Sequence, residues 1–114
     1  MAHAIEKATD YEIRHGEAVA LGCLFVAELA RSEGLITDEL AARHATAFGL
    51  VGLPTSWDGA SFDDLRATMA VDKKSRGSQL RFVVLQGLAQ PRILAGPAEE
   101  SLRAAHDVLV GGIR

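Results

Sequence analysis

Residues 17–32 have the sequence EAVALGCLFVAELARS, and this stretch decides the fold of the chain. If it forms a helix, its apolar side chains cover most of the helical cylinder instead of one stripe. These side chains are Val19, Leu21, Cys23, Leu24, Phe25, Val26 and Leu29. A helix that is apolar on most sides is normally buried on most sides. The stretch therefore predicts a helix at the centre of the native packing.

Two further helices are expected next to it along the chain. Residues 3–9 have helical composition, and the polar residues 10–14 separate them from the central helix. Gly34 is suited to the left-handed conformation that ends many helices. Thr37 has the side chain of an N-cap residue and is followed by two acidic residues, so it predicts the start of a helix that runs to about Phe48.

Two more helices are expected in the second half of the chain. Ser61 begins an acidic capping box, which predicts a helix through about residue 71. The polar residues 72–77 are expected to form a turn. Pro97 is suited to the first helical position, and the glycines at 111 and 112 are expected to end that last helix. Its expected inner face consists of Leu102, Ala105, Leu109 and Val110.

One segment has the composition of a β-hairpin. Residues 80–85 are rich in β-branched and aromatic side chains, and residues 92–94 are a candidate return strand. Gly87 and Pro91 bracket the connection between them. The predicted fold class is therefore mainly α: a single multi-helix domain over residues 1–114 with one small two-stranded β-hairpin.

Composition excludes several classes of protein. The chain has 114 residues, of which 48% are hydrophobic and 24% charged, as in an ordered globular domain. A net charge of −3 without a basic cluster argues against a nucleic-acid partner. The longest uncharged run is too short to cross a bilayer, so no membrane association is expected. Because the single Cys23 allows no intrachain disulfide, a reducing compartment and a cytoplasmic location are expected.

Two histidines near the start of the chain are candidate functional residues. Imidazole is a common metal ligand, and it can also donate a hydrogen bond to phosphate. His15 is followed by Gly16 at the start of the central helix, where a glycine leaves the backbone unhindered near a ligand. On composition alone, the competing interpretation is that His3 and His15 are ordinary surface or capping histidines.

Five motifs follow one another along the chain: His3-Ala-Ile-Glu6, His15-Gly-Glu-Ala-Val-Ala-Leu-Gly22, Gly52-Leu-Pro54, Asp72-Lys-Lys74 with Gly77, and the strand at 80–85. In this order they resemble the carboxy-terminal helical domain of the 3-dehydroquinate synthases. Together they span nearly the whole chain. The lysine pair followed by a glycine and a Phe-Val-Val-Leu strand favours the synthases over the related alcohol and glycerol dehydrogenases.

The resemblance implies a role for several residues. His15 would be one of three protein ligands of a catalytic Zn or Co ion, and His3 would contact the phosphate of the substrate. Lys73 and Lys74 match the paired lysines of the family, of which one, with Lys74 favoured, would hold the same phosphate. Glu17 would support the ligand histidine. Before the resemblance is considered, a solvated turn is the simpler interpretation of the lysines.

The resemblance also implies a reaction and a partner domain. The family converts 3-deoxy-D-arabino-heptulosonate 7-phosphate, a sugar acid phosphate, to 3-dehydroquinate and phosphate in the shikimate pathway, with NAD as a transient oxidant. The sequence contains no nucleotide-binding pattern and only one of the three metal ligands. We therefore expect it to be part of a larger lyase, to lack the N-terminal NAD-binding domain, and to be inactive alone without tight binding of NAD or metal.

Three alternatives remain open at this stage. A related sugar phosphate cyclase could act on a different substrate, or the chain could be a non-catalytic helical interaction module. An uncovered domain face would also allow two copies to form a homodimer. Among the remaining residues, His44, His106 and Arg81 are expected at the surface, Cys23 in the core, and Trp57 over a hydrophobic edge.

Overall fold

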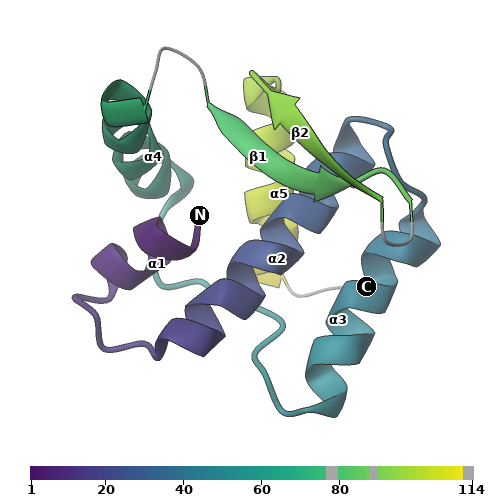
Figure 1. The fold of residues 1–114 in the computed structure, drawn as a ribbon. Helices are drawn as coiled ribbons and strands as arrows, with labels where there is room; N and C mark the ends of the chain where they lie inside the picture. The colour runs from purple at the N-terminus through teal and green to yellow at the C-terminus, as the bar shows by residue number, and fades with distance from the viewer. Residues whose placement is uncertain (77–79, 88–89, 112–114) are drawn as a thin grey trace.

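The computed structural model describes residues 1–76, 80–87 and 90–111, and for residues 72–76 the backbone alone. These residues form five helices and one two-stranded antiparallel sheet, which confirms the predicted fold class (Figure 1). In chain order the elements are α1 (Ala2–Ala8), α2 (His15–Ser32), α3 (Asp38–Leu50), α4 (Phe62–Arg76), β1 (Arg81–Leu85), β2 (Pro91–Ala95) and α5 (Glu99–Gly111).

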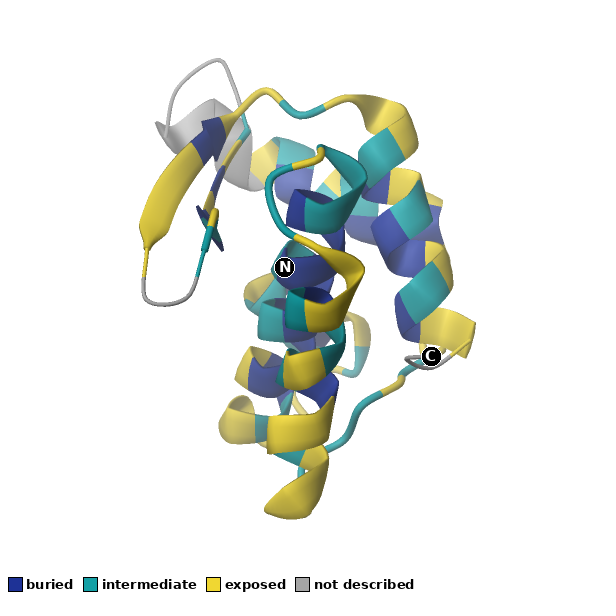
Figure 2. Ribbon diagram, turned by 90° about the vertical axis from the view of Figure 1, so that its right-hand side faces the viewer, coloured by how far each residue is buried: buried dark blue, intermediate teal, exposed yellow. Residues whose placement is uncertain are grey.

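The central position predicted for α2 is confirmed. This helix packs against α1, α3, α5 and β1, and its residues from Leu24 to Ala30 are buried apart from the half-buried Val26. Figure 2 shows the buried residues on the inner sides of the helices, with exposed residues on the outer sides of the helices and of the hairpin. Among the apolar side chains of α2, Val19 is the one that is exposed. One side of the central helix is therefore left open to solvent.

Three of the signals that the sequence predicted for helix ends are confirmed. The hydroxyl of Thr37 accepts the backbone N–H of Leu40 at the start of α3, and the hydroxyl of Ser61 accepts that of Asp64 at the start of α4. Gly34 has a φ of 77°, the left-handed conformation in which a Cβ would be strained. These local signals fix where the chain turns around α2.

The hairpin lies with one face on the core. In β1 the side chains of Phe82 and Val84 are buried, and the ring centroid of Phe82 lies 6.0 Å from that of Phe25 in α2. Leu94, the partner of Phe82 in β2, is buried on the same face. Arg81 is exposed at the start of β1, as expected. The hairpin thus closes the core over α2.

Three predictions about the second half of the chain were wrong. The segment 72–77 was expected to form a polar turn, but α4 continues to Arg76. This segment contains neither glycine nor proline before Gly77, so continuing the intrahelical hydrogen bonds costs less than breaking them. Val110 was expected on the inner face of α5 and is exposed, whereas Leu102, Ala105 and Leu109 are buried as predicted. The last helix also begins at Glu99, two residues after Pro97.

His106 was expected at the surface and is buried. Its Nε2 lies 3.2 Å from the carbonyl oxygen of Ala60, and its ring meets that of Phe62 edge to face. Trp57 is half-buried against the core, and its backbone N–H donates to the carbonyl of Leu109. The loop before α4 is therefore attached to α5. No helix in the described parts of the chain is long and apolar enough to span a membrane.

Candidate functional site

The candidate site lies where α1 leads into α2. His15 is the first residue of α2, and Arg14 is its N-cap. The carboxylate of Glu17 accepts the backbone N–H of Arg14 at 3.3 Å, which completes a capping interaction at the start of the helix. The local sequence thus fixes the backbone from which the His15 ring projects.

Glu6 is the carboxylate in contact with His15. Its Oε2 lies 3.2 Å from Nδ1 of the ring. The side chain of His15 is 76% exposed, whereas that of Glu6 is only 16% exposed. The ring therefore extends from a half-buried carboxylate into solvent. Glu17, which was expected to support the ligand histidine, contacts the backbone of Arg14 instead.

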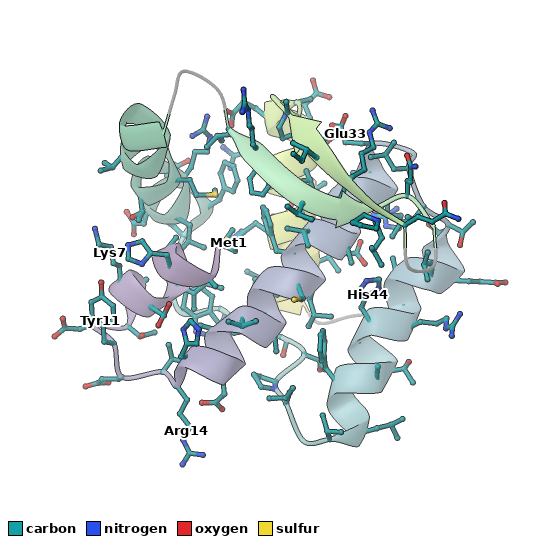
Figure 3. The ribbon with its side chains drawn as sticks, in the orientation of Figure 1. Met1, Lys7, Tyr11, Arg14, Glu33 and His44 are labelled. Carbon is teal, nitrogen blue, oxygen red and sulfur yellow. The ribbon has the colours of Figure 1, made fainter. Side chains whose placement is uncertain are left out.

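A tight connection brings Glu6 and His15 together. The backbone N–H of Tyr11 donates to the carbonyl of Glu6 at 2.8 Å, and that of Asp10 donates to Lys7 at 3.0 Å. Asp10 and Tyr11 have φ values of 53° and 62°, which residues with a Cβ rarely adopt. Figure 3 shows Lys7, Tyr11 and Arg14 along the outer edge of this corner. The turn is what returns the chain so that the start of α2 lies beside α1.

The predicted phosphate ligands lie on two helices that pack against each other. His3 is exposed on α1, one turn before Glu6 on the same helix. Lys73 and Lys74 belong to the backbone of α4, but their side chains lie outside the described residues. Because α1 packs against both α2 and α4, the helix of His3 contacts the helices that carry the other candidates.

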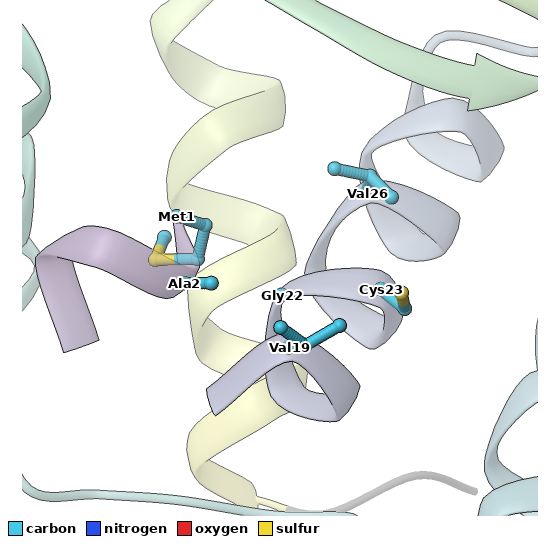
Figure 4. Close-up of a pocket in the computed structure, with 6 residues that line it drawn as sticks. All are labelled: Met1, Ala2, Val19, Gly22, Cys23 and Val26. Atoms are coloured by element: carbon cyan, nitrogen blue, oxygen red, sulfur yellow. The ribbon is translucent and has the colours of Figure 1, made fainter. Parts of the chain in front are cut away.

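An apolar groove continues the open side of α2 away from His15. It is a shallow cavity of about 250 Å³ lined by Met1, Ala2, Val19, Gly22, Cys23 and Val26 (Figure 4). His15, Val19 and Cys23 are spaced by four residues and so lie along one side of the helix. A Cβ at Gly22 would lie 3.3 Å from the backbone nitrogen of Ala2, so the glycine permits the close approach of α1.

Cys23 has a different environment from the one expected. It was expected in the core, but it is only half-buried and lines the groove. Burial raises the pKa of its thiol above the ordinary value. A raised pKa lowers the fraction of reactive thiolate at neutral pH, so the groove has the character of an apolar surface instead of a nucleophilic site.

The donor chemistry of the site fits one protein ligand of a divalent metal ion. In the part of the chain that the structure describes, no three His, Cys, Asp or Glu side chains gather as a metal-binding group. A catalytic zinc site has about three protein ligands. His15, with a half-buried carboxylate at Nδ1, has the arrangement usual for a metal-ligating histidine. The described residues therefore fit one ligand position of a divalent metal site and not a complete site.

Sequence reasoning identified His3 and His15 but gave no role to Glu6. Nine residues separate Glu6 from His15, and this spacing matches neither the helical nor the strand period because the chain reverses between them. The turn itself had no recognisable signal either, since Asp10 and Tyr11 are not the glycines that usually mark a left-handed conformation.

Comparison with known proteins identifies relatives over nearly the whole chain. The model of the family described as "3-dehydroquinate synthase C-terminal" matches residues 1–75. The 3-dehydroquinate synthase of Corynebacterium jeikeium (strain K411) is 50% identical over 109 residues, which are 96% of this chain and 30% of that protein. The 3-dehydroquinate synthase of Thermobifida fusca (strain YX) is 47% identical, over 97% of this chain and 30% of that protein.

Two solved structures share the fold. A crystal structure of 2-deoxy-scyllo-inosose synthase has a TM-score of 0.72 at 23% identity and covers 97% of this chain and 31% of its own. Another, complexed with carbaglucose-6-phosphate, NAD+ and Co2+, has a TM-score of 0.74 at 25% identity, over 97% of this chain and 32% of its own. The chain thus spans about 30% of the length of the curated relatives it matches. From its matched family model and its close relatives, the chain belongs to the 3-dehydroquinate synthase family and corresponds to its C-terminal part.

Proposed function

We propose that this chain supplies the C-terminal metal and substrate part of a 3-dehydroquinate synthase. The complete enzyme would convert 3-deoxy-D-arabino-heptulosonate 7-phosphate to 3-dehydroquinate and phosphate, a phosphorus–oxygen lyase reaction of the shikimate pathway. The observation that carries the proposal is the exposed ring of His15, projecting from the start of α2 with Glu6 at its Nδ1. We also propose a cytoplasmic location, which the lone Cys23 supports.

His15 would hold a Zn or Co ion together with ligands from the NAD-binding part of the enzyme. When bound, the metal would polarise substrate hydroxyl oxygens as a Lewis acid, and NAD would accept and return a hydride. The role of this chain is to fix the ring: the capped start of α2 sets the position of its Cα, and Glu6 limits its rotation. Preorganised ligands of this kind lower the cost of reaching the reactive geometry.

His3 would bind the phosphate of the substrate, together with Lys73 or Lys74. In favour of this, α1 and α4 pack against each other and His3 is exposed on α1. Cationic and hydrogen-bond donor groups around a phosphate orient it and stabilise the charge that develops as it leaves. The proposal therefore assigns the hydroxyl groups of the substrate that would bind the metal to α2, and the phosphate of the substrate to α1 and α4.

The choice of substrate rests on the relatives. The curated relatives at 47–50% identity are named 3-dehydroquinate synthases, whereas the cyclase that was solved with carbaglucose-6-phosphate is 25% identical. A different sugar phosphate cyclase is the alternative. Assaying the complete enzyme with both the seven-carbon sugar acid phosphate and glucose 6-phosphate distinguishes the two.

The test joins this chain to the N-terminal part of the Corynebacterium jeikeium synthase. We expect the joined protein, with NAD and Co2+, to release inorganic phosphate from 3-deoxy-D-arabino-heptulosonate 7-phosphate. His15→Ala should lower kcat/KM by more than the roughly 10- to 100-fold that is typical for groups that support metal ligands. His44→Ala is the matched control, because His44 lies on α3 and its Nδ1 contacts the carbonyl of Leu40.

Two results would contradict the proposal. One is a folded joined protein that binds NAD and Co2+ but releases no phosphate from this substrate. The other is a His15→Ala variant that keeps the activity of the parent. Conversion of glucose 6-phosphate in place of the seven-carbon substrate would instead favour the alternative cyclase.

A further inference from the structure

We propose that Glu6 is a positioning residue that fixes both the tautomer and the orientation of the His15 ring. The inference deepens the proposed function and rests on it for the metal, but the contact itself is a property of this chain. Glu6 Oε2 lies 3.2 Å from His15 Nδ1, and the two residues come from different helices. The pair therefore links α1 to the first turn of α2.

The chemistry of the two groups makes the contact directional. The Glu6 carboxylate is half-buried, with 16% of its side chain exposed, and His15 is the donor that lies beside it. An ionised carboxylate can only accept hydrogen bonds, so a neutral His15 must carry its proton on Nδ1. The lone pair then lies on Nε2, the nitrogen that points away from Glu6. Among the described residues, Nε2 of His15 has no hydrogen-bond partner.

The backbone around Glu6 is arranged to hold it in place. The carbonyl of Glu6 accepts hydrogen bonds from the Thr9 hydroxyl at 3.1 Å and from the Tyr11 N–H at 2.8 Å. The left-handed conformation of Asp10 and Tyr11 is strained, and such strain persists only where surrounding contacts compensate for it. This turn is what brings a residue of α1 to the start of α2, so the strained backbone and the Glu6–His15 contact occur together.

The first test reads the tautomer of His15 in this chain without metal or NAD. Two-bond ¹H–¹⁵N NMR correlations at about pH 8.5, above the range in which histidine normally titrates, distinguish a protonated from an unprotonated Nε2. We expect an unprotonated Nε2 in the parent chain, with the signal assigned by its loss in His15→Ala. Glu6→Ala should move the proton to Nε2, whereas Glu6→Gln should not, because its amide oxygen still accepts from Nδ1.

Glu17→Ala is the matched control. It removes another acidic residue near His15, but its carboxylate contacts the Arg14 backbone and not the ring, so the tautomer should not change. A protonated Nε2 in the parent chain, or no change in Glu6→Ala, would overturn the inference and leave the proposed function standing. If His15 has the expected tautomers but the joined enzyme releases no phosphate, the inference about Glu6 stands and the proposed function is contradicted.

The second test measures Co2+ affinity in the joined enzyme by titration calorimetry. We expect about 10- to 100-fold weaker binding in Glu6→Ala, a smaller loss in Glu6→Gln, and parent affinity in Glu12→Ala, which changes an exposed acidic residue between α1 and α2. If Glu6→Ala does not fold, the inference is judged on Glu6→Gln alone: a retained tautomer with weaker Co2+ binding supports it, and unchanged affinity overturns it.

Discussion

At the scale of single residues, Glu28 and Arg31 form the most deeply buried ion pair among the described residues. The Glu28 side chain is 2% exposed within α2, and its Oε2 accepts from Nε of Arg31 at 2.8 Å. The hydrogen bond to Glu28 raises the pKa of Arg31 above its ordinary value. A buried carboxylate is tolerated when its charge is paired and hydrogen-bonded, so Arg31 should matter mainly because it compensates Glu28.

Arg31→Met should destabilise the chain by about 3 kcal/mol, because it removes the charge and the 2.8 Å hydrogen bond of Arg31 from the buried Glu28 carboxylate while the aliphatic part of the side chain is retained. Urea unfolding followed by circular dichroism measures the change in the free energy of unfolding. Arg43→Met, at an exposed position of α3, is the control and should change that free energy by less than about 0.5 kcal/mol. Equal effects of the two substitutions would show that the buried pair contributes nothing specific.

Buried polar residues were the least predictable from the sequence. His106 was expected at the surface, because its helix is amphipathic and no partner is near it in the sequence. Its partners, the Ala60 carbonyl and the Phe62 ring, are more than 40 residues away and come into contact only in the folded chain. Glu6 was missed as the partner of His15 for the same reason. Sequence patterns within one helix carry no information about such contacts.

At the scale of elements, the hairpin has one buried and one exposed face, and two adjacent valines of β1 lie on opposite faces. Val84 is 2% exposed and faces the core, whereas Val83 is 66% exposed and is paired with the exposed Ile93. The alternation follows from the two-residue period of a strand, and this is why composition could predict the hairpin. The end of α4 was harder to predict, because polar residues occur both in turns and on exposed helix faces.

Val84→Thr should therefore cost about 1–3 kcal/mol, since it places a hydroxyl in the apolar core without a partner. Val83→Thr makes the same chemical change on the outer face and should alter the free energy of unfolding by less than about 0.5 kcal/mol. Urea unfolding of both variants measures the difference. If the two substitutions cost the same, the assignment of the hairpin faces is incorrect.

At the scale of the whole molecule, the domain is built around α2 but leaves one side of that helix open. The other sides are covered by α1, α3, α5 and β1, and the open side carries His15 and the apolar groove. The central helix could be predicted from the apolar composition of residues 17–32, because that composition shows how much of the surface of the helix is suited to burial. It could not show which side stays uncovered, because the sides of a helix that is apolar all round look alike in the sequence.

This arrangement predicts an uneven local stability, which native-state hydrogen exchange can measure. The amides of residues 24–30 in α2 should exchange slowest, because covering elements must separate before that helix opens. The seven-residue α1 buries only Ala4 and Ile5 and should exchange at least about 100-fold faster, in a local opening that also releases Glu6 from His15. Glu6→Ala should speed exchange in α1 further and leave α2 unchanged. Equal protection of α1 and α2 would mean that the helix carrying His3 and Glu6 opens only with the whole domain, and that the site is as rigid as the core.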